Sequence, residues 1–146
     1  MKVVLQRSKK STVTVDKKIV GKIDFGLVLL VSFTLTDTEK EVNELIDKII
    51  NLRIFNDENG VMNKSLLDVE GEILSISQFT LYGDTLKGRR PSYINAMPGN
   101  KAKPLYDLFN KKIKQKNIKI ETGIFGADML VNTINDGPIT FILESR

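Results

Sequence analysis

The hydrophobic positions of this chain follow a strand period in its first part. Apolar and polar residues alternate over residues 11–15 and return over residues 18–23 after the turn Asp16-Lys17, which predicts a hairpin with one buried face. Residues 2–7 form a further predicted strand ahead of it. Residues 26–33 are almost continuously apolar, so we expect a central strand that is buried on both faces.

A helical period replaces the strand period in two places. Over residues 36–52 the apolar positions recur at helical spacing, and Thr36 with Glu39 fits a capping box at the start of the helix. Over residues 102–115 a second apolar stripe predicts another helix. The residues expected on the core sides of the two helices are Val42, Leu45, Ile46, Ile49 and Ile50, and Leu105, Leu108, Phe109 and Ile113.

The remaining apolar runs complete the predicted fold. Strands are expected at residues 73–77, 118–122, 129–134 and 139–143, with Asn135-Asp136-Gly137-Pro138 as the turn between the last two. This order of elements predicts an α+β fold, with two main helices packed against a largely antiparallel β-sheet or barrel. No linker or repeat divides the chain, so residues 1–146 are expected to form a single domain.

The composition excludes several kinds of chemistry. The chain contains neither cysteine nor histidine, which rules out disulfides, thiolate nucleophiles and a triad with a histidine base. The same absence removes the usual ligands of a zinc site, so no metal or cofactor is expected. No apolar run reaches membrane-spanning length and the N-terminal apolar part is too short for a signal peptide, so we expect a soluble cytoplasmic protein with no membrane partner.

Positive charge is concentrated in one segment. Residues 85–120 contain ten lysines and arginines and a single acid, Asp107, so this segment carries +9 and the rest of the chain −5. Such asymmetry indicates a polyanionic partner, with nucleic acid as the first candidate, although a solvated lysine-rich helix face gives the same pattern. Within the segment, Lys87-Gly88-Arg89-Arg90-Pro91-Ser92 combines three cations with a glycine, which suits phosphate contacts.

Three other stretches carry side chains that a plain sheet protein does not require. The strand at 73–77 runs into Ser77-Gln78-Phe79-Thr80, where polar groups are either hydrogen-bonded internally, as at an ordinary strand end, or open to a ligand. Small residues around Phe125 permit close approach of a planar ligand such as a base. The pair Gly137-Pro138 forms either an ordinary turn or a cis peptide bond.

These stretches together resemble the D-aminoacyl-tRNA deacylase family. The main matches are Ser77-Gln78-Phe79-Thr80 and Asn135-Asp136-Gly137-Pro138-Ile139-Thr140. Supporting matches are Leu52-Arg53-Ile54-Phe55, Met62-Asn63-Lys64-Ser65-Leu66, Lys87-Gly88-Arg89-Arg90-Pro91-Ser92 and Gly123-Ile124-Phe125-Gly126-Ala127-Asp128-Met129. Two long motifs in the family's order, over nearly the full length, make this a specific resemblance.

The resemblance implies a homodimer with active sites at the subunit interface. Such an enzyme hydrolyses the ester between a D-amino acid, or glycine, and the terminal ribose of tRNA, and it needs no cofactor and no DNA partner. A cis Gly137-Pro138 pair is implied to reach into the partner's site, where its carbonyls would leave no room for an L side chain. Chirality would therefore be selected by backbone.

The resemblance also implies roles for individual residues. Catalytic roles fall on Thr80, Ser77 and Phe79, and substrate binding on Gln78, Phe125, Gly126, Ala127 and Met129. The basic residues Lys87, Arg89 and Arg90 are expected on the tRNA backbone. Because no histidine is available, either Thr80 attacks the ester, or the 2′-hydroxyl of the tRNA helps to activate water while backbone N–H groups bind the oxyanion. The composition favours water.

Two other classes of function remain open from the residues alone. One is a non-catalytic RNA-binding module that uses the basic segment and Phe125. The other is a structural α+β protein whose charge only keeps it in solution. Hydrolysis of a D-aminoacyl ester distinguishes the enzyme from both, and a steep salt dependence of tRNA binding distinguishes the first from the second.

Overall fold

A computed structural model describes all 146 residues of the chain. The strands are β1 (Lys2–Ser8), β2 (Ser11–Val15), β3 (Lys18–Ile23), β4 (Gly26–Ser32), β5 (Phe55–Asn56), β6 (Met62–Lys64), β7 (Glu72–Ser77), β8 (Ile120–Thr122), β9 (Leu130–Asn132) and β10 (Asn135–Glu144). The helices are α1 (Glu39–Asn51) and α2 (Gly99–Gln115), and a short 3₁₀ turn, η1 (Phe79–Tyr82), follows β7.

The main sheet is mixed rather than largely antiparallel. Its strand order is β10-β1-β4-β7-β8, in which β1 pairs antiparallel with both neighbours while β4, β7 and β8 are mutually parallel. The reason lies in the connections, because α1 joins β4 to β7 and α2 joins β7 to β8, and a helical crossover returns the chain in the same direction. The predicted α+β class with two main helices is therefore confirmed, and the predicted strand direction is wrong for half of this sheet.

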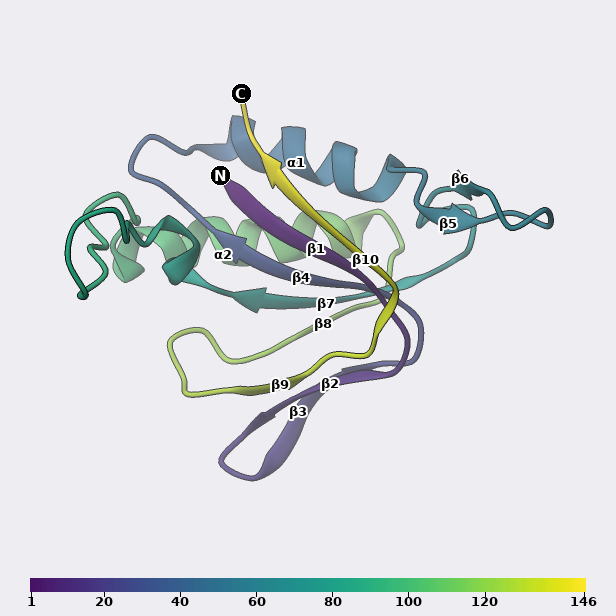
Figure 1. Ribbon diagram of the computed structural model, residues 1–146, viewed down its shortest axis with the longest axis horizontal. Helices are drawn as coiled ribbons and strands as arrows, with labels where there is room; N and C mark the ends of the chain where they lie inside the picture. The colour runs from purple at the N-terminus through teal and green to yellow at the C-terminus, as the bar shows by residue number, and fades with distance from the viewer.

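Two hydrophobic layers enclose the main sheet. Both helices cover one of its faces, and the antiparallel sheet β3-β2-β9 lies on the other (Figure 1). Strand β4 serves both layers, because Leu27 and Leu29 pack toward the helices while Val28 packs toward the second sheet. This confirms the central strand predicted from the continuous apolar run.

The helices begin at other residues than predicted. Helix α1 has Thr38 as its N-cap, with the capping box formed by Thr38 and Glu41, because Thr36 lies in the turn closed by the bond from the Asp37 N–H to the Thr34 carbonyl (3.1 Å). All five core residues predicted for α1 are buried.

Helix α2 begins at Gly99, three residues before the predicted start at Ala102. Its buried stripe is Ala102, Tyr106, Phe109 and Ile113, and the predicted core residues Leu105 and Leu108 are only half-buried. Tyr106 is a core residue that the predicted stripe does not include, and its buried hydroxyl needs a hydrogen-bond partner.

The predicted turn at residues 135–138 belongs to β10. Strand β10 pairs with β1 before and after this segment, at Ser8↔Asn135 and at Gln6↔Thr140. Between these two pairs β1 advances by two residues and β10 by five. The extra residues form a bulge inside the strand pair. None of the helices is long and apolar enough to cross a membrane.

Candidate active site

A cleft of about 740 Å³ opens at the carboxyl ends of the three parallel strands. Its walls come from residues 31–33 at the end of β4, residues 76–79 at the end of β7, the segment that leads into α2, and the loop after β8. The volume lies within the range of small-ligand sites, and most of the lining residues are apolar.

The cleft brings together most of the residues predicted to contact the substrate. Seven of them line it: Ser77, Gln78, Phe79, Phe125, Gly126, Ala127 and Met129. Thr80 lies beside the cleft in η1 without lining it. The residues Gly137 and Pro138 lie on β10, and Lys87, Arg89 and Arg90 lie on a separate loop, so neither set lines this cleft.

The strand end at Ser77 is partly hydrogen-bonded and partly open. The Gln78 N–H donates to the Val31 carbonyl (2.8 Å), which keeps the chain against β4, and the Gln78 side-chain amide donates to Thr80 Oγ1 (2.5 Å). The Phe79 ring is 58% exposed and meets the Tyr93 ring at 5.0 Å between centroids. An exposed aromatic face at a cleft is suited to stacking on a base.

The loop after β8 is folded back on itself by a close contact. A Cβ at Gly123 would lie 2.3 Å from Met129 Sδ, so only glycine allows the Met129 side chain to pack there. The Ala127 N–H donates to the Ile124 carbonyl (3.1 Å), and the Phe125 ring lies 5.7 Å from that of Tyr106. The two ends of the loop are thereby held together while Phe125 faces the cleft.

The bulge in β10 is held by side chains on both sides. The Gly137-Pro138 peptide bond is cis, and Gly137 has φ +120°. Asn135 binds the chain beyond the bulge, because its Oδ1 accepts from the Ile139 N–H (3.2 Å) and its Nδ2 donates to Thr140 Oγ1 (2.9 Å).

Arg7 holds the same bulge from β1. This arginine is only 7% exposed, and its Nε lies 3.1 Å from Asp136 Oδ2 in an ion pair that is not aligned as a hydrogen bond. Its Nη1 donates to the Ile54 carbonyl (2.9 Å) and to Asn56 Oδ1 (3.1 Å). Arg7 is not among the predicted site residues, although Val3, Leu5 and Arg7 alternate along one face of β1, and a charge at a core position signals a buried partner.

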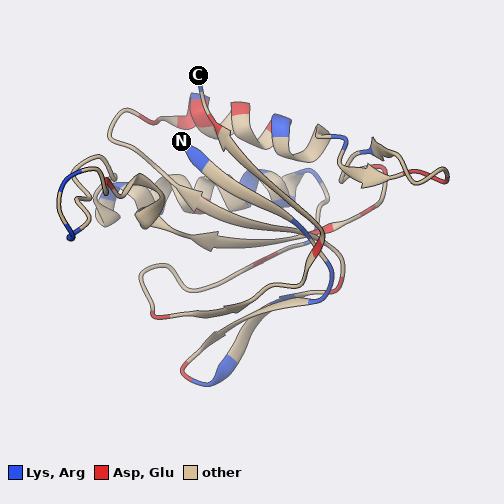
Figure 2. Ribbon diagram, viewed as in Figure 1, with Lys and Arg blue, Asp and Glu red and all other residues tan.

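The predicted phosphate-contacting residues lie on an exposed loop. Residues 84 and 92 close this loop through two backbone hydrogen bonds of 2.8 and 2.9 Å. The loop carries Lys87, Arg89 and Arg90, none of which has an ion-pair partner. Figure 2 shows where basic and acidic residues lie along the ribbon. The next residue, Tyr93, lines the cleft. The loop therefore presents three free cations beside the cleft entrance.

Three other lysines of the basic segment are neutralised by carboxylates. Their ion pairs are Lys103–Asp107 (2.6 Å), Lys112–Glu39 (2.8 Å) and Lys119–Glu72 (2.8 Å). The positive segment is thus divided into cations that are free to bind a polyanion and cations that already have a partner.

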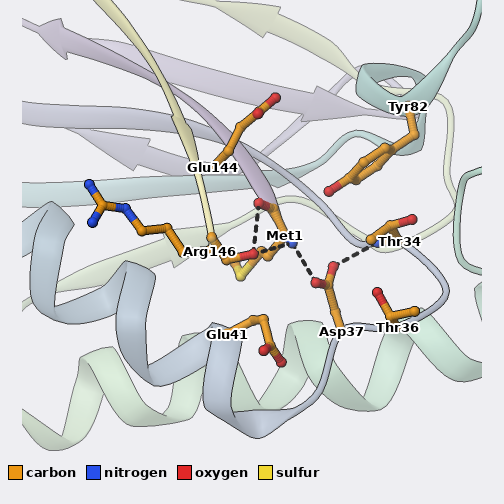
Figure 3. Close-up of a pocket in the computed structure, with 9 residues that line it drawn as sticks. Met1, Thr34, Thr36, Asp37, Glu41, Tyr82, Glu144 and Arg146 are labelled. Carbon is orange, nitrogen blue, oxygen red and sulfur yellow. Dashed lines mark hydrogen bonds and ion pairs between the residues drawn. The ribbon is translucent and has the colours of Figure 1, made fainter.

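A second, smaller pocket of about 240 Å³ lies between the chain ends and α1 (Figure 3). The Met1 ammonium contacts Asp37 Oδ1 (2.5 Å) and Ser145 Oγ (2.6 Å), and Asp37 Oδ2 accepts from the Thr34 N–H (2.7 Å). Burial, with the nearby carboxylates of Asp37 and Glu144, raises the pKa of Tyr82 to about 12. The Met1 ammonium, Asp37 and Ser145 satisfy one another, so these contacts hold the two chain ends in place.

Comparison with known proteins identifies the family of the chain. The family model described as D-Tyr-tRNA(Tyr) deacylase matches residues 4–144. Two curated relatives named D-aminoacyl-tRNA deacylase, from Bacillus cereus and Bacillus cytotoxicus, are 59% and 58% identical over the full length of both chains.

Solved structures share the fold. One described as c-Myc DNA Unwinding Element Binding Protein has a TM-score of 0.94 at 41% identity, over 100% of this chain and 99% of that one. Another, described as a probable eukaryotic D-amino acid tRNA deacylase, has a TM-score of 0.85 at 18% identity, over 98% of both chains, and shows the same fold.

These matches define an aminoacyl-tRNA deacylase, which is a hydrolase. The chain belongs to the D-Tyr-tRNA(Tyr) deacylase family. The predicted family and enzyme class are confirmed, and the enzyme is favoured over the non-catalytic RNA-binding module.

Proposed function

We propose that the cleft hydrolyses the ester of D-aminoacyl-tRNA, and of mischarged glycyl-tRNA, and releases free tRNA. The observation that carries this proposal is that Ser77-Gln78-Phe79 and the loop 125–129 line one cleft at the ends of parallel strands. The terminal adenosine and the ester would lie between these two walls. Rates of hydrolysis of matched D-tyrosyl-, L-tyrosyl- and glycyl-tRNA test the proposal, which fails if L-tyrosyl-tRNA is cleaved as fast as the D form.

Water is the proposed nucleophile, activated with the help of the tRNA 2′-hydroxyl. Thr80 Oγ1 accepts a hydrogen bond from the Gln78 amide, which withdraws electron density from the oxygen. No histidine exists in the chain to take the Thr80 proton. The N–H groups of Phe79 and Thr80, which begin η1 and have no partner within that turn, are the proposed oxyanion donors.

Thr80→Ala is therefore expected to lower the single-turnover rate by no more than about tenfold, whereas loss of a covalent nucleophile costs at least about three orders of magnitude. Thr80→Ser is the matched control, because it keeps the hydroxyl that Gln78 binds. Acid quenching of the wild-type reaction followed by mass measurement provides a second reading. An acyl group trapped on Thr80 would contradict the proposal.

We also propose that Gly137-Pro138 acts in the site of a second copy of the chain. Neither residue lines the cleft of its own subunit. Large apolar side chains are exposed close by on β9 and β10, including Leu130, Phe141 and Ile142. A homodimer that covers these side chains would bring the bulge of one subunit to the cleft of the other, where its backbone would exclude L-amino acids.

The free cations of the loop 84–92 are proposed to bind the tRNA backbone. Neutralising Lys87, Arg89 and Arg90 together is expected to weaken binding of all tRNAs alike and to flatten the salt slope, by about 0.7–0.9 for each phosphate that the variant no longer neutralises. The matched control neutralises the three paired lysines, Lys103, Lys112 and Lys119, which removes the same net charge. Equal slopes for both triple variants would show that only total charge matters.

A further inference from the structure

The side chain of Tyr106 lies behind the cleft, in the middle of α2. It is only 3% exposed, and its hydroxyl donates to the Ser75 carbonyl (2.8 Å). The Ser75 hydroxyl in turn donates to the Tyr106 oxygen at 3.3 Å. Burial raises the pKa of Tyr106, so the phenol stays protonated and remains a donor.

The Ser75 carbonyl occupies a special place in the sheet. Pairing between β7 and β8 ends at Ser75↔Thr122. The next N–H along the chain, that of Gly123, donates to the Ser75 carbonyl over a long distance of 3.4 Å. At this point one chain runs on into Ser77 and the other departs into the loop that carries Phe125. The Tyr106 hydroxyl is thus the closer donor at the point where the two walls of the cleft separate.

The ring of Tyr106 supports the second wall directly. Its centroid lies 5.7 Å from that of Phe125, with the planes inclined at 45°. Phe125 lines the cleft, whereas Tyr106 does not. One side chain therefore holds the base of the Ser77 wall through its hydroxyl and the Phe125 wall through its ring.

We propose that Tyr106 is a positioning residue that sets the separation of the two walls, without touching the substrate. The proposal rests on the proposed function, in which the terminal nucleotide and the ester lie between these walls. The hydroxyl then affects kcat, because it fixes the strand that leads into the reacting groups. The ring affects KM, because it supports the Phe125 face.

Three variants separate these roles. Tyr106→Phe removes only the hydroxyl and is expected to lower kcat about tenfold with KM within about twofold, as for the loss of one hydrogen bond. Tyr106→Leu also removes the ring and is expected to raise KM in addition. Ser75→Ala is the matched control, because it keeps the carbonyl and loses only the longer bond, so wild-type kinetics are expected.

A readout that needs no catalysis distinguishes this proposal from a failure of the proposed function. In protein labelled with fluorophenylalanine, the Phe125 resonance, assigned by its loss in Phe125→Leu, is expected to shift or broaden in Tyr106→Phe and to stay unchanged in Ser75→Ala. All measurements are made where circular dichroism shows the variants folded. An inactive wild type would overturn the proposed function while leaving this comparison intact.

The proposal is overturned if Tyr106→Phe changes only the melting temperature, with wild-type kcat and an unchanged Phe125 resonance. It is also overturned if Ser75→Ala loses as much kcat as Tyr106→Phe. A double-mutant cycle gives the final reading: the KM effects of Tyr106→Leu and Phe125→Leu are expected not to add, because one acts through the other. Additive effects would separate Tyr106 from Phe125.

Discussion

Replacing Gly137 with alanine is expected to reduce hydrolysis of D-aminoacyl-tRNA by at least about 100-fold, the cost of misplacing a positioning group by about 1 Å. Gly137 has φ +120°, where an L side chain is strained. An added Cβ would lie 2.8 Å from Ile139 Cγ1 and 3.1 Å from the Ile139 nitrogen. The Ile139 side chain can turn away, but the Ile139 nitrogen has to shift. Together with the strain at positive φ, we expect this to move the backbone that Asn135 holds through the Ile139 N–H, and with it the carbonyls proposed to exclude L-amino acids.

The measurement is the ratio of single-turnover rates on D- and L-tyrosyl-tRNA for the folded variant. Gly60→Ala is the matched control: Gly60 also has positive φ (+76°), but a Cβ there meets nothing within 4 Å, far from the cleft. It adds a methyl group at a second glycine of positive φ, and it should keep both the rate and the D/L ratio. An unchanged rate and ratio in Gly137→Ala would remove the bulge from the mechanism.

If the chain forms the proposed homodimer, a mixed dimer of two variants distinguishes action of Gly137 in its own subunit from action in the partner. The second variant, Ala127→Trp, is designed to fill the cleft of its own subunit, and each homodimer is first checked to be inactive. If the bulge acts in the partner's site, the mixed dimer contains one intact cleft facing one intact bulge and recovers up to about half of the wild-type activity. Recovery of none would place Gly137 in the site of its own chain.

The meeting of the two cleft walls was predictable from the sequence only through family resemblance. Residues 77–79 and 125–129 are far apart along the chain, and hydrophobic periodicity identifies strands without showing their direction. An antiparallel arrangement would put the two strand ends at opposite edges of the sheet. The observed parallel pairing of β4, β7 and β8 puts the carboxyl ends together, which is why ligands often bind at such edges.

The errors in the sequence analysis have a common physical origin. The segment 135–138 contains turn residues, yet tertiary pairing with β1 incorporates it into β10 as a bulge. Tyr106 and Arg7 are polar residues at core positions, and each is buried because specific distant groups pair with it. The Ser75 carbonyl accepts from Tyr106, whereas Arg7 donates to the Ile54 carbonyl and forms an ion pair with Asp136. Local patterns cannot identify such partners.

Replacing Arg7 with methionine is expected to destabilise the fold by about 3 kcal/mol, the lower end for breaking a buried ion pair, and to remove most of the activity as well. The lower end applies because the Asp136 side chain is 28% exposed and can be partly rehydrated. The Ile54 carbonyl and Asn56 Oδ1 lose their donor at the same time. Without the guanidinium, nothing from β1 holds Asp136, so the bulge next to Gly137 should lose its fixed position.

Denaturant unfolding and D- and L-tyrosyl-tRNA rates on the same samples check this expectation. Arg53→Met is the control, because Arg53 is exposed and donates to a single acceptor, the Asn63 carbonyl (2.8 Å), so a small effect on both quantities is expected. Arg7→Lys keeps the charge, but one ammonium cannot reach carbonyl, amide and carboxylate together as the guanidinium fork does. Arg7→Lys should therefore regain part of the stability and little of the D/L selectivity. Wild-type selectivity in Arg7→Lys would mean that the positive charge at this position, and not the shape of the guanidinium group, holds the bulge.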